Sequence, residues 1–385
     1  MRSKKNNSYS SSYSTECQTQ KKLINKIGQP LMGWSLGEIA EMLQHDYHHL
    51  DEPFAGQLEG KLIIGDKTYG VAKAFPLGIH LVKPPKILGI FKFVPVLYDL
   101  LRSLWLIGSA DQRTCILVNG GPRFGILTCI LNSFIPIRRR KIVLWEAYIP
   151  TSKLKKRLAR RMILGTSLTV IYSRRQLEVQ AKLLQVPKSK FIFIPYKAEH
   201  SIFPPITMQI GGYVFSGGTS RRDYQTLFEA VRDTGIPVIV SAANPKVFAT
   251  LDVPENVVLL AARVPAAAFA RLMAASCFVV VPMQPHLVRG AGEATVINAM
   301  WHGRAVICAD DICAFEYIEE GVTGYVTPPG DAARLRERII ELWNQPKRAT
   351  EMGRSAHQAV AANLTDEHFS RRLRALGAIV AVSKE

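Results

Sequence analysis

The sequence predicts an α/β protein made of two doubly wound, Rossmann-like domains. Short apolar runs alternate with helical patterns in the first half, a proline-containing break follows, and the alternation then restarts. Short apolar strands separated by helices are typical of parallel sheets covered on both faces. At 385 residues the chain is long enough for two such domains, each with its own core.

The first half holds β-like runs that are mostly followed by helical patterns, such as residues 125–132 and 175–184. The runs are residues 62–64, 79–82, 115–118, 142–145, 168–171 and 191–194. The break falls at residues 195–208, where Pro204 and Pro205 continue neither a helix nor a strand. We therefore expect an N-terminal domain over residues 25–203. Residues 1–24 are rich in Ser, Asn and Lys and lack the apolar stretch of a secretory signal, which predicts a disordered tail.

The second half, residues 204–365, repeats the pattern. Strands are expected at residues 213–215, 238–240, 257–260, 278–281, 305–307 and 324–326. Helices are expected at residues 224–234, 266–275, 294–302, 332–345 and 347–363. A last helical pattern begins at Asp366.

A small-residue turn before a helix is the most informative ligand signal. Gly292, Glu293, Ala294 and Thr295 lead into an apolar helix that breaks at Gly303, before the next strand. Such a turn presents free backbone N–H groups and the positive end of a helix dipole. The sequence therefore predicts a phosphate site here.

A second signal lies where another strand meets a helix. Ser216, Gly217 and Gly218 end the strand, and Arg221 and Arg222 precede the helix. Glycine lets the backbone approach a ligand, and guanidinium groups match phosphate oxygens. The alternative is a pair of surface arginines at a turn.

Together these motifs resemble the C-terminal half of retaining glycosyltransferases of the GT-B fold, family 4 (glycosyl transferases group 1). Residues 292–307 are similar to the family pattern G-x-x-x-x-E-A-M-x-x-G-x-P-V, and the turn ending at Asp331 is similar to G-x-x-G-x-L-V-x-P-G-D. The resemblance implies a GT-B fold with the nucleotide-sugar donor domain at residues 204–365. It also implies that residues 366–385 form a helix that crosses back to the first domain.

The resemblance also implies roles for single residues. Arg222 takes the place of the family Lys that clamps the donor pyrophosphate, and Thr219 takes the place of the family Arg. Arg221 is the candidate for a second clamp. Arg263 and Val264 follow a strand in the loop that resembles the family's nucleobase-binding segment.

Two family glutamates, separated by seven residues, fall here on other residue types. The second, which binds the ribose hydroxyls, falls on Asn298, and the first falls near Gly290. Asparagine keeps hydrogen bonding without the charge. Glu293 is then the candidate carboxylate for the donor sugar or for Arg222; alternatively, it is a helix-start acid favoured by the dipole.

The first domain offers acceptor-side candidates. Gly120, Gly121 and Arg123 lie between a strand and a helix, and Glu146 ends the next strand. In a GT-B protein these positions face the cleft, where Arg123 would meet an acidic acceptor; a plain turn and a structural ion pair are the alternatives. The segment around Glu199 resembles the family's interdomain I-P-x-G-V-D-x-x-x-F.

Formal charge is +18 and is concentrated in the first domain. Residues 153–164 alternate basic residues with Leu154, Leu158, Met162 and Ile163, which predicts a helix with a cationic face. A helix of this kind fits an anionic membrane surface best. The alternatives are that it packs on the domain's own core or that it binds nucleic acid, although no base-reading motif accompanies it. The apolar window 87–107 carries charges that disfavour a membrane span and fits an interfacial or a core helix.

Cysteine and histidine usage bear on compartment and metal binding. Cys115, Cys277 and Cys308 lie in or next to β-like runs and no C-x-x-C pair occurs, so free thiols and a reducing cytosol are expected. His45, His48 and His49 share one helix face, but a polar helix end is favoured over a metal site.

The predicted function is transfer of a hexose, with retention, from a UDP- or GDP-sugar to a glycan or lipid-linked acceptor in polysaccharide biosynthesis. The resemblance implies no metal or other cofactor, and nucleic acid is not an expected partner. The protein is expected in the cytoplasm, at the inner face of the membrane. The alternatives are a degenerate GT-B protein that binds nucleotide without turnover and a nucleotide-sugar 2-epimerase.

Overall fold

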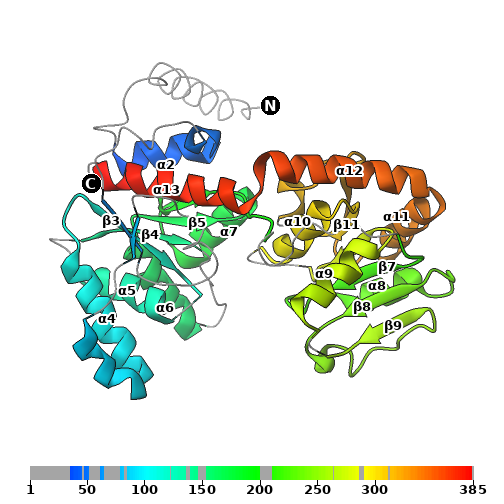
Figure 1. The fold of residues 1–385 in the computed structure, drawn as a ribbon, viewed down its shortest axis with the longest axis horizontal. Helices are drawn as coiled ribbons and strands as arrows, with labels where there is room; N and C mark the ends of the chain where they lie inside the picture. The colour runs from blue at the N-terminus through cyan, green and yellow to red at the C-terminus, as the bar shows by residue number, and fades with distance from the viewer. Residues whose placement is uncertain are drawn as a thin grey trace, which may run out of the picture.

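The computed structural model of the protein describes most of the chain. The described residues are 35–45, 47–51, 61–64, 79–81, 85–121, 123–135, 139–145, 153–199, 210–262, 264–285, 290–310 and 313–383. They form two α/β domains, shown in Figure 1, each with a six-stranded parallel sheet. The predicted fold class is confirmed. The predicted tail, residues 1–24, lies outside the described residues.

The N-terminal sheet has the strand order β2-β1-β3-β4-β5-β6. Its strands are β1 (Lys61–Ile64), β2 (Ile79–Leu81), β3 (Thr114–Asn119), β4 (Lys141–Trp145), β5 (Leu168–Ile171) and β6 (Phe191–Phe193). Its helical segments are α2 (Leu36–His45), η1 (Tyr47–Leu50), η3 (Lys86–Phe93), α4 (Pro95–Ser109), α5 (Arg123–Asn132), α6 (Lys153–Leu164), α7 (Arg174–Leu184) and η4 (Lys188–Lys190).

Alternation along β3 divides this core into two layers. Cys115 and Leu117 pack with α2 and the C-terminal helix, whereas Ile116 and Val118 pack with α4 to α7. Successive side chains of a strand point to opposite faces, so a continuous apolar run fills both layers. Burial raises the pKa of the Cys115 thiol to about 12, and this cysteine is free, as expected.

The C-terminal sheet has the strand order β12-β11-β10-β7-β8-β9. Its strands are β7 (Val214–Gly217), β8 (Val238–Ser241), β9 (Val257–Leu260), β10 (Val279–Pro282), β11 (Val306–Ala309) and β12 (Gly324–Thr327). Its helical segments are α8 (Tyr224–Val231), η5 (Pro245–Val247), α9 (Ala266–Ala275), α10 (Glu293–Trp301), η6 (Ala314–Glu316), α11 (Ala332–Asn344) and α12 (Pro346–Asn363). The chain leaves β7 toward one side and returns through β10 on the other. The sheet therefore has a topological switch point between these two strands, which is where ligands of doubly wound folds bind.

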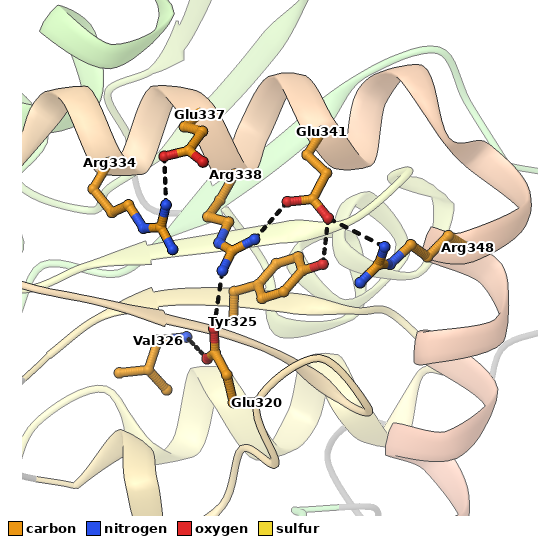
Figure 2. A network of polar contacts seen from close by, with 8 residues as sticks. All are labelled: Glu320, Tyr325, Val326, Arg334, Glu337, Arg338, Glu341 and Arg348. Atoms are coloured by element: carbon orange, nitrogen blue, oxygen red, sulfur yellow. Dashed lines mark hydrogen bonds and ion pairs between the residues drawn. The ribbon is translucent and has the colours of Figure 1, made fainter.

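The edge strand β12 is joined to α11 by a polar network, shown in Figure 2. Tyr325 donates from its hydroxyl to Glu341, and the Arg338 guanidinium lies 4.0 Å from the Tyr325 ring centroid. Burial alone would raise the pKa of Glu341, but hydrogen bonds from Tyr325 and Arg338 lower it overall. Because this network contacts neither β7 nor β10, we assign it to the packing of α11.

The last helix, α13 (Asp366–Val382), joins the two domains. Figure 1 shows α12 lying along the C-terminal domain and α13 continuing over the N-terminal domain. There α13 packs on β1, β3 and β4, and Lys141 donates from Nζ to the Ala381 carbonyl oxygen over 2.9 Å. Arg372 donates to both carboxylate oxygens of Asp51, over 2.8 and 2.6 Å.

The predicted cationic helix is present as α6, but its apolar residues are divided. Met162 and Ile163 are buried against the core, whereas Leu158 is exposed. Arg157, Arg160 and Arg161 are also exposed. One part of the predicted stripe is therefore core, and the outer face is cationic.

The histidine cluster and the apolar window 87–107 are the sequence features that bear on metal binding and on membrane spanning. Among the described residues, no group of three His, Cys, Asp or Glu side chains could hold a metal ion, and no helix is long and apolar enough to cross a membrane. Nδ1 of His48 lies 3.2 Å from Asp51, and the side chains of His45 and His49 are not among those that the structure describes.

The two other cysteines expected in or next to strands are also free thiols. Cys308 is buried, whereas Cys277 is only half-buried.

Candidate functional site

The loop after β7 is folded around the side chain of Arg222. Gly218 has φ +106, and a Cβ there would lie 2.8 Å from Nη2 of Arg222. Glycine is required at this position both for the backbone conformation and for the closeness of the guanidinium. Asp223 then caps α8 by accepting from the Thr226 N–H over 3.1 Å, which fixes where the helix starts.

Arg222 is buried and its guanidinium is held from several sides. Nε donates to the Gly217 carbonyl oxygen over 3.0 Å, and Nη1 donates to that of Ser220 over 2.9 Å and contacts Sδ of Met283 at 3.0 Å. Nη2 donates to Oγ1 of Thr295 over 2.8 Å. The guanidinium therefore spans the switch point, from the end of β7 to the start of α10.

The N-terminus of α10 begins at a glycine and has no side-chain cap. Gly292 is the N-cap residue, with φ +97. A Cβ on Gly292 would lie 3.3 Å from Nη1 of Arg222 and 3.0 Å from Sδ of Met283. Ala294 and Thr295 are partly buried in the first turn. The structure thus brings the two predicted phosphate-binding motifs together, with a cation beside a helix N-terminus.

Glu293 is folded back over Gly290. The Glu293 side chain is buried, and a Cβ on Gly290 would lie 1.8 Å from its Oε1. The carboxylate therefore occupies the space where a side chain of residue 290 would begin. In the resemblance the first family glutamate falls near Gly290, and the structure places the Glu293 carboxylate beside that residue.

Asn298 is engaged in the interdomain segment. It is 2% exposed, and its Oδ1 accepts a 2.9 Å hydrogen bond from the Glu199 N–H. The segment is held further by Lys197, which pairs with Asp366, and by Ala198, whose N–H donates to the Leu364 carbonyl oxygen over 2.7 Å. Here Asn298 fixes the link between the domains, a contact that the sequence did not indicate.

The remaining donor-side candidates are placed as follows. Ser216 is fully buried within β7, so its hydroxyl is not available to a donor. Arg221 is exposed with φ 56, and its carbonyl oxygen accepts from the Gln284 N–H over 3.0 Å. Val264 is half-buried before α9, and Arg263 lies outside the described residues.

A cavity of about 550 Å³ adjoins the Arg222 loop. Its lining runs from Thr219 to Gln225 and includes Val247, Leu251 and Gln284. It therefore lies at the ends of β7 and β8, and α10 does not line it. Arg222 is shared between this cavity and the α10 N-terminus, so we place the anion site by the hydrogen bonds of Arg222 and not by the cavity alone.

On the acceptor side, the turn after β3 is tightly built. The Gly120 N–H donates to the Trp145 carbonyl oxygen over 2.7 Å, and the Gly121 N–H donates to Oδ1 of Asn119 over 2.6 Å. Arg123 begins α5 with a half-exposed side chain, 3.9 Å from Asp99. Glu146 lies outside the described residues.

One side chain at the junction of the domains was missed by sequence reasoning. Gln176, near the start of α7, is 7% exposed, and its Oε1 has no hydrogen-bond partner among the described residues. A Cβ on Gly290 would lie 3.4 Å from that oxygen. The only available signal was a polar residue soon after a strand end, which is too common to single out.

Further contacts hold the two domains together beside the site. Glu316 accepts from the Arg174 backbone and from its Nη1, both over 2.7 Å. The Tyr317 hydroxyl donates to the Tyr172 carbonyl oxygen over 2.7 Å and accepts from the Tyr196 N–H over 3.0 Å.

Comparisons with known proteins bear on the C-terminal domain and on the fold. Residues 228–345 match the family model described as glycosyl transferases group 1. The chain therefore contains a glycosyl transferases group 1 domain that includes α10. A search against curated protein sequences found no match.

Solved GT-B glycosyltransferases share the two-domain fold over most of this chain. Anabaena HepE in complex with UDP-glucose superposes with a TM-score of 0.57 at 16% identity, over 81% of this chain and 98% of that one. Sucrose-phosphate synthase from Thermosynechococcus elongatus gives 0.56 at 15%, over 77% and 79%. A glycosyltransferase from Rickettsia africae gives 0.54 at 13%, over 86% and 93%. At these identities the likeness establishes the fold.

Proposed function

We propose that the protein is a retaining glycosyltransferase that takes a hexose from a UDP- or GDP-sugar. The observation that supports this most is the buried Arg222 guanidinium at the N-terminus of α10, at the switch point of the donor-type domain. A cation and backbone amides that converge there suit the diphosphate of a nucleotide sugar. The group 1 domain match over residues 228–345 supports the same assignment.

In the proposed reaction the bond between the sugar anomeric carbon and the diphosphate breaks, and an acceptor oxygen bonds to the same face of that carbon. The acceptor proton passes to the leaving phosphate. Arg222 and the amides of Glu293, Ala294 and Thr295 stabilise the negative charge that grows on the diphosphate, without a metal ion. Preorganised groups of this kind can supply most of a rate enhancement. Glu293, whose carboxylate lies over Gly290, would hydrogen-bond the sugar.

The N-terminal domain would hold the acceptor, a glycan or a lipid-linked saccharide. Gly120, Gly121, Arg123 and Glu146 follow strand ends in this domain, where cleft residues of doubly wound folds lie. The exposed cations of α6 would hold the protein at the cytoplasmic face of an anionic membrane. This location suits an enzyme of polysaccharide biosynthesis.

The proposal is tested by incubating the purified chain with UDP- and GDP-sugars, with and without a lipid-linked saccharide acceptor. We expect release of UDP or GDP, and a product whose anomeric configuration, read by NMR, equals that of the donor. A product with the opposite configuration would refute retention. Epimerised donor in the absence of acceptor would instead identify an epimerase.

A second candidate, a nucleotide-binding protein without turnover, is favoured by one observation. Oδ1 of Asn298, at the family position for ribose recognition, accepts from the Glu199 N–H and is buried. Titration calorimetry that detects UDP binding, combined with no loss of sugar from any donor, would select this candidate.

A further inference from the structure

The segment 86–96 carries an exposed row of large apolar side chains, which we name the apolar ridge. Phe93 is 94% exposed, and Ile87, Ile90, Val94 and Val96 are each more than half exposed. Single exposed apolar residues are normal on protein surfaces, but a contiguous group marks an interaction site. In Figure 1, α4 lies at the edge of the N-terminal domain remote from the C-terminal domain.

The ridge is attached to a firmly packed helix. Farther along α4, Ser103, Leu106 and Ile107 are buried, and Oγ of Ser103 donates to the Asp99 carbonyl oxygen over 2.8 Å. Pro95 occupies the first turn, where its missing N–H removes no helical hydrogen bond. The second half of α4 therefore anchors the helix in the core, while its start and η3 present apolar groups outward.

The surroundings of the ridge are cationic. No acidic residue occurs from position 85 to position 98, a stretch that contains Lys86 and Lys92. The α5 helix packs between α4 and α6, and α6 contains no acidic residue. Phe134, just after α5, is 62% exposed, and the Arg161 guanidinium lies 5.2 Å from its ring centroid. Exposed apolar side chains thus occur along the ridge and at Phe134, and exposed cations occur on α6, which packs on the same helix α5 as α4 does.

We propose that the apolar ridge inserts into the interfacial region of an anionic lipid bilayer while the cations of α6 lie at the headgroups. Aromatic and aliphatic side chains beside Lys and Arg are the combination that binds such an interface. Charge favours a lipid bilayer over a second copy of the chain as the partner that covers the ridge. A formal charge of +18 makes two copies repel, whereas anionic lipid attracts Lys86 and Lys92 in the ridge segment and the cations of α6.

This inference extends the membrane attachment proposed above and does not depend on sugar transfer. Vesicle binding is measured without donor or acceptor, so the two proposals fail separately. Absence of turnover with intact vesicle binding removes the enzyme assignment alone.

The test compares two valines of nearly equal exposure, Val94 at 53% and Val258 at 57%, the latter in β9 of the other domain. Full-length protein is sedimented with vesicles of equimolar phosphatidylcholine and phosphatidylglycerol, and with phosphatidylcholine alone. We expect V94S to weaken binding to the anionic vesicles several-fold, F93S to weaken it about tenfold or more, and V258S to leave it unchanged. Circular dichroism and melting temperature establish that each variant is folded.

An F93W variant reports the depth of insertion directly. We expect its added fluorescence to shift to the blue with anionic vesicles and to be quenched by brominated acyl chains. Binding of F93S equal to that of the wild type would overturn the proposal. So would concentration-dependent dimerisation that F93S abolishes in the absence of vesicle binding, because the ridge would then be an interface between copies.

Discussion

Nη2 of Arg222 donates a 2.8 Å hydrogen bond to Oγ1 of Thr295, joining the loop after β7 to the first turn of α10. The two residues are far apart in the chain and meet because β7 and β10 are neighbours in the sheet. We infer that this bond orients the guanidinium toward the site in which the proposed diphosphate would lie.

Removal of the Arg222 guanidinium should lower kcat/KM more than removal of an exposed arginine does. We expect Arg222→Ala to lower kcat/KM for the nucleotide sugar by about 10²- to 10³-fold, the effect of losing one preorganised donor. The kcat/KM of Arg222→Lys should lie between those of Arg222→Ala and the wild type, because a single ammonium group cannot make the paired hydrogen bonds of a guanidinium. Steady-state kinetics with Arg271→Ala, an exposed arginine of α9, provides the control. Equal activity in Arg222→Ala and Arg271→Ala would remove Arg222 from the site.

The hydrogen bond itself is tested at Thr295. Thr295→Val keeps the shape but removes the acceptor, so kcat/KM should fall by about tenfold, whereas Thr295→Ser should stay near the wild type. In a double-mutant cycle, Thr295→Val should have little further effect once Arg222 is alanine. Additive effects would mean that Thr295 acts independently of Arg222.

The position of Glu293 depends on the absence of a side chain at residue 290. In Gly290→Ala the new Cβ would lie 1.8 Å from Oε1 of Glu293, so the carboxylate has to move. We expect kcat/KM to fall by about tenfold to a hundredfold, with a small change in melting temperature. Gly212→Ala is the matched control, since nothing lies within 4 Å of a Cβ there. If both variants are equally active, the carboxylate has no role in turnover.

Attachment of α13 to the N-terminal domain depends on a buried charge. The Arg372 side chain is 1% exposed and pairs with Asp51 over 2.6 Å. Asp51→Asn should lower the free energy of unfolding by about 3 kcal/mol, because it leaves the guanidinium charge uncompensated. Glu178→Gln removes an exposed pair with Lys188 and should cost less than about 1 kcal/mol. Urea denaturation measures the free energy of unfolding of both variants. Similar losses in the two would contradict the conclusion that the Arg372–Asp51 pair holds α13 in place.

His302 should make the fold sensitive to acid. It is buried, neither ring nitrogen has a hydrogen-bond partner among the described residues, and burial together with Arg304 lowers its pKa to about 4. Between pH 6.5 and 4 the unfolded chain binds the proton more readily, so stability falls as pH decreases, by roughly 3 kcal/mol for this group.

Replacement by a neutral residue should remove this contribution. His302→Leu should lose less stability between pH 7 and about pH 4 than the wild type does, measured by urea midpoints across that range. Val258→Ser, at an exposed position without a titratable side chain, should keep the shape of the wild-type profile. Parallel profiles for His302→Leu and the wild type would show that other groups set the acid sensitivity.

The elements of the fold were largely predictable from local pattern. The expected bounds of α9 equal the observed ones, Ala266–Ala275, and the helix expected to begin at Asp366 is present as α13. The strand runs were predictable because buried parallel strands are continuously apolar. The helix predicted at residues 224–234 ends earlier, at Val231, since Arg232 and Asp233 leave the helical conformation.

The sequence by itself determined the two-domain α/β class and the two motifs that could bind phosphate, because strand and helix periodicities and glycine turns are local properties. Only the tertiary structure decided that Arg222 meets Thr295, that Glu293 fills the space over Gly290, and that Asn298 holds the interdomain segment. It also decided that Phe93 stays exposed although its segment is as apolar as a core helix. These contacts join residues from different strands, helices and domains, and strand order and helix packing set such distances, which no spacing along the chain encodes.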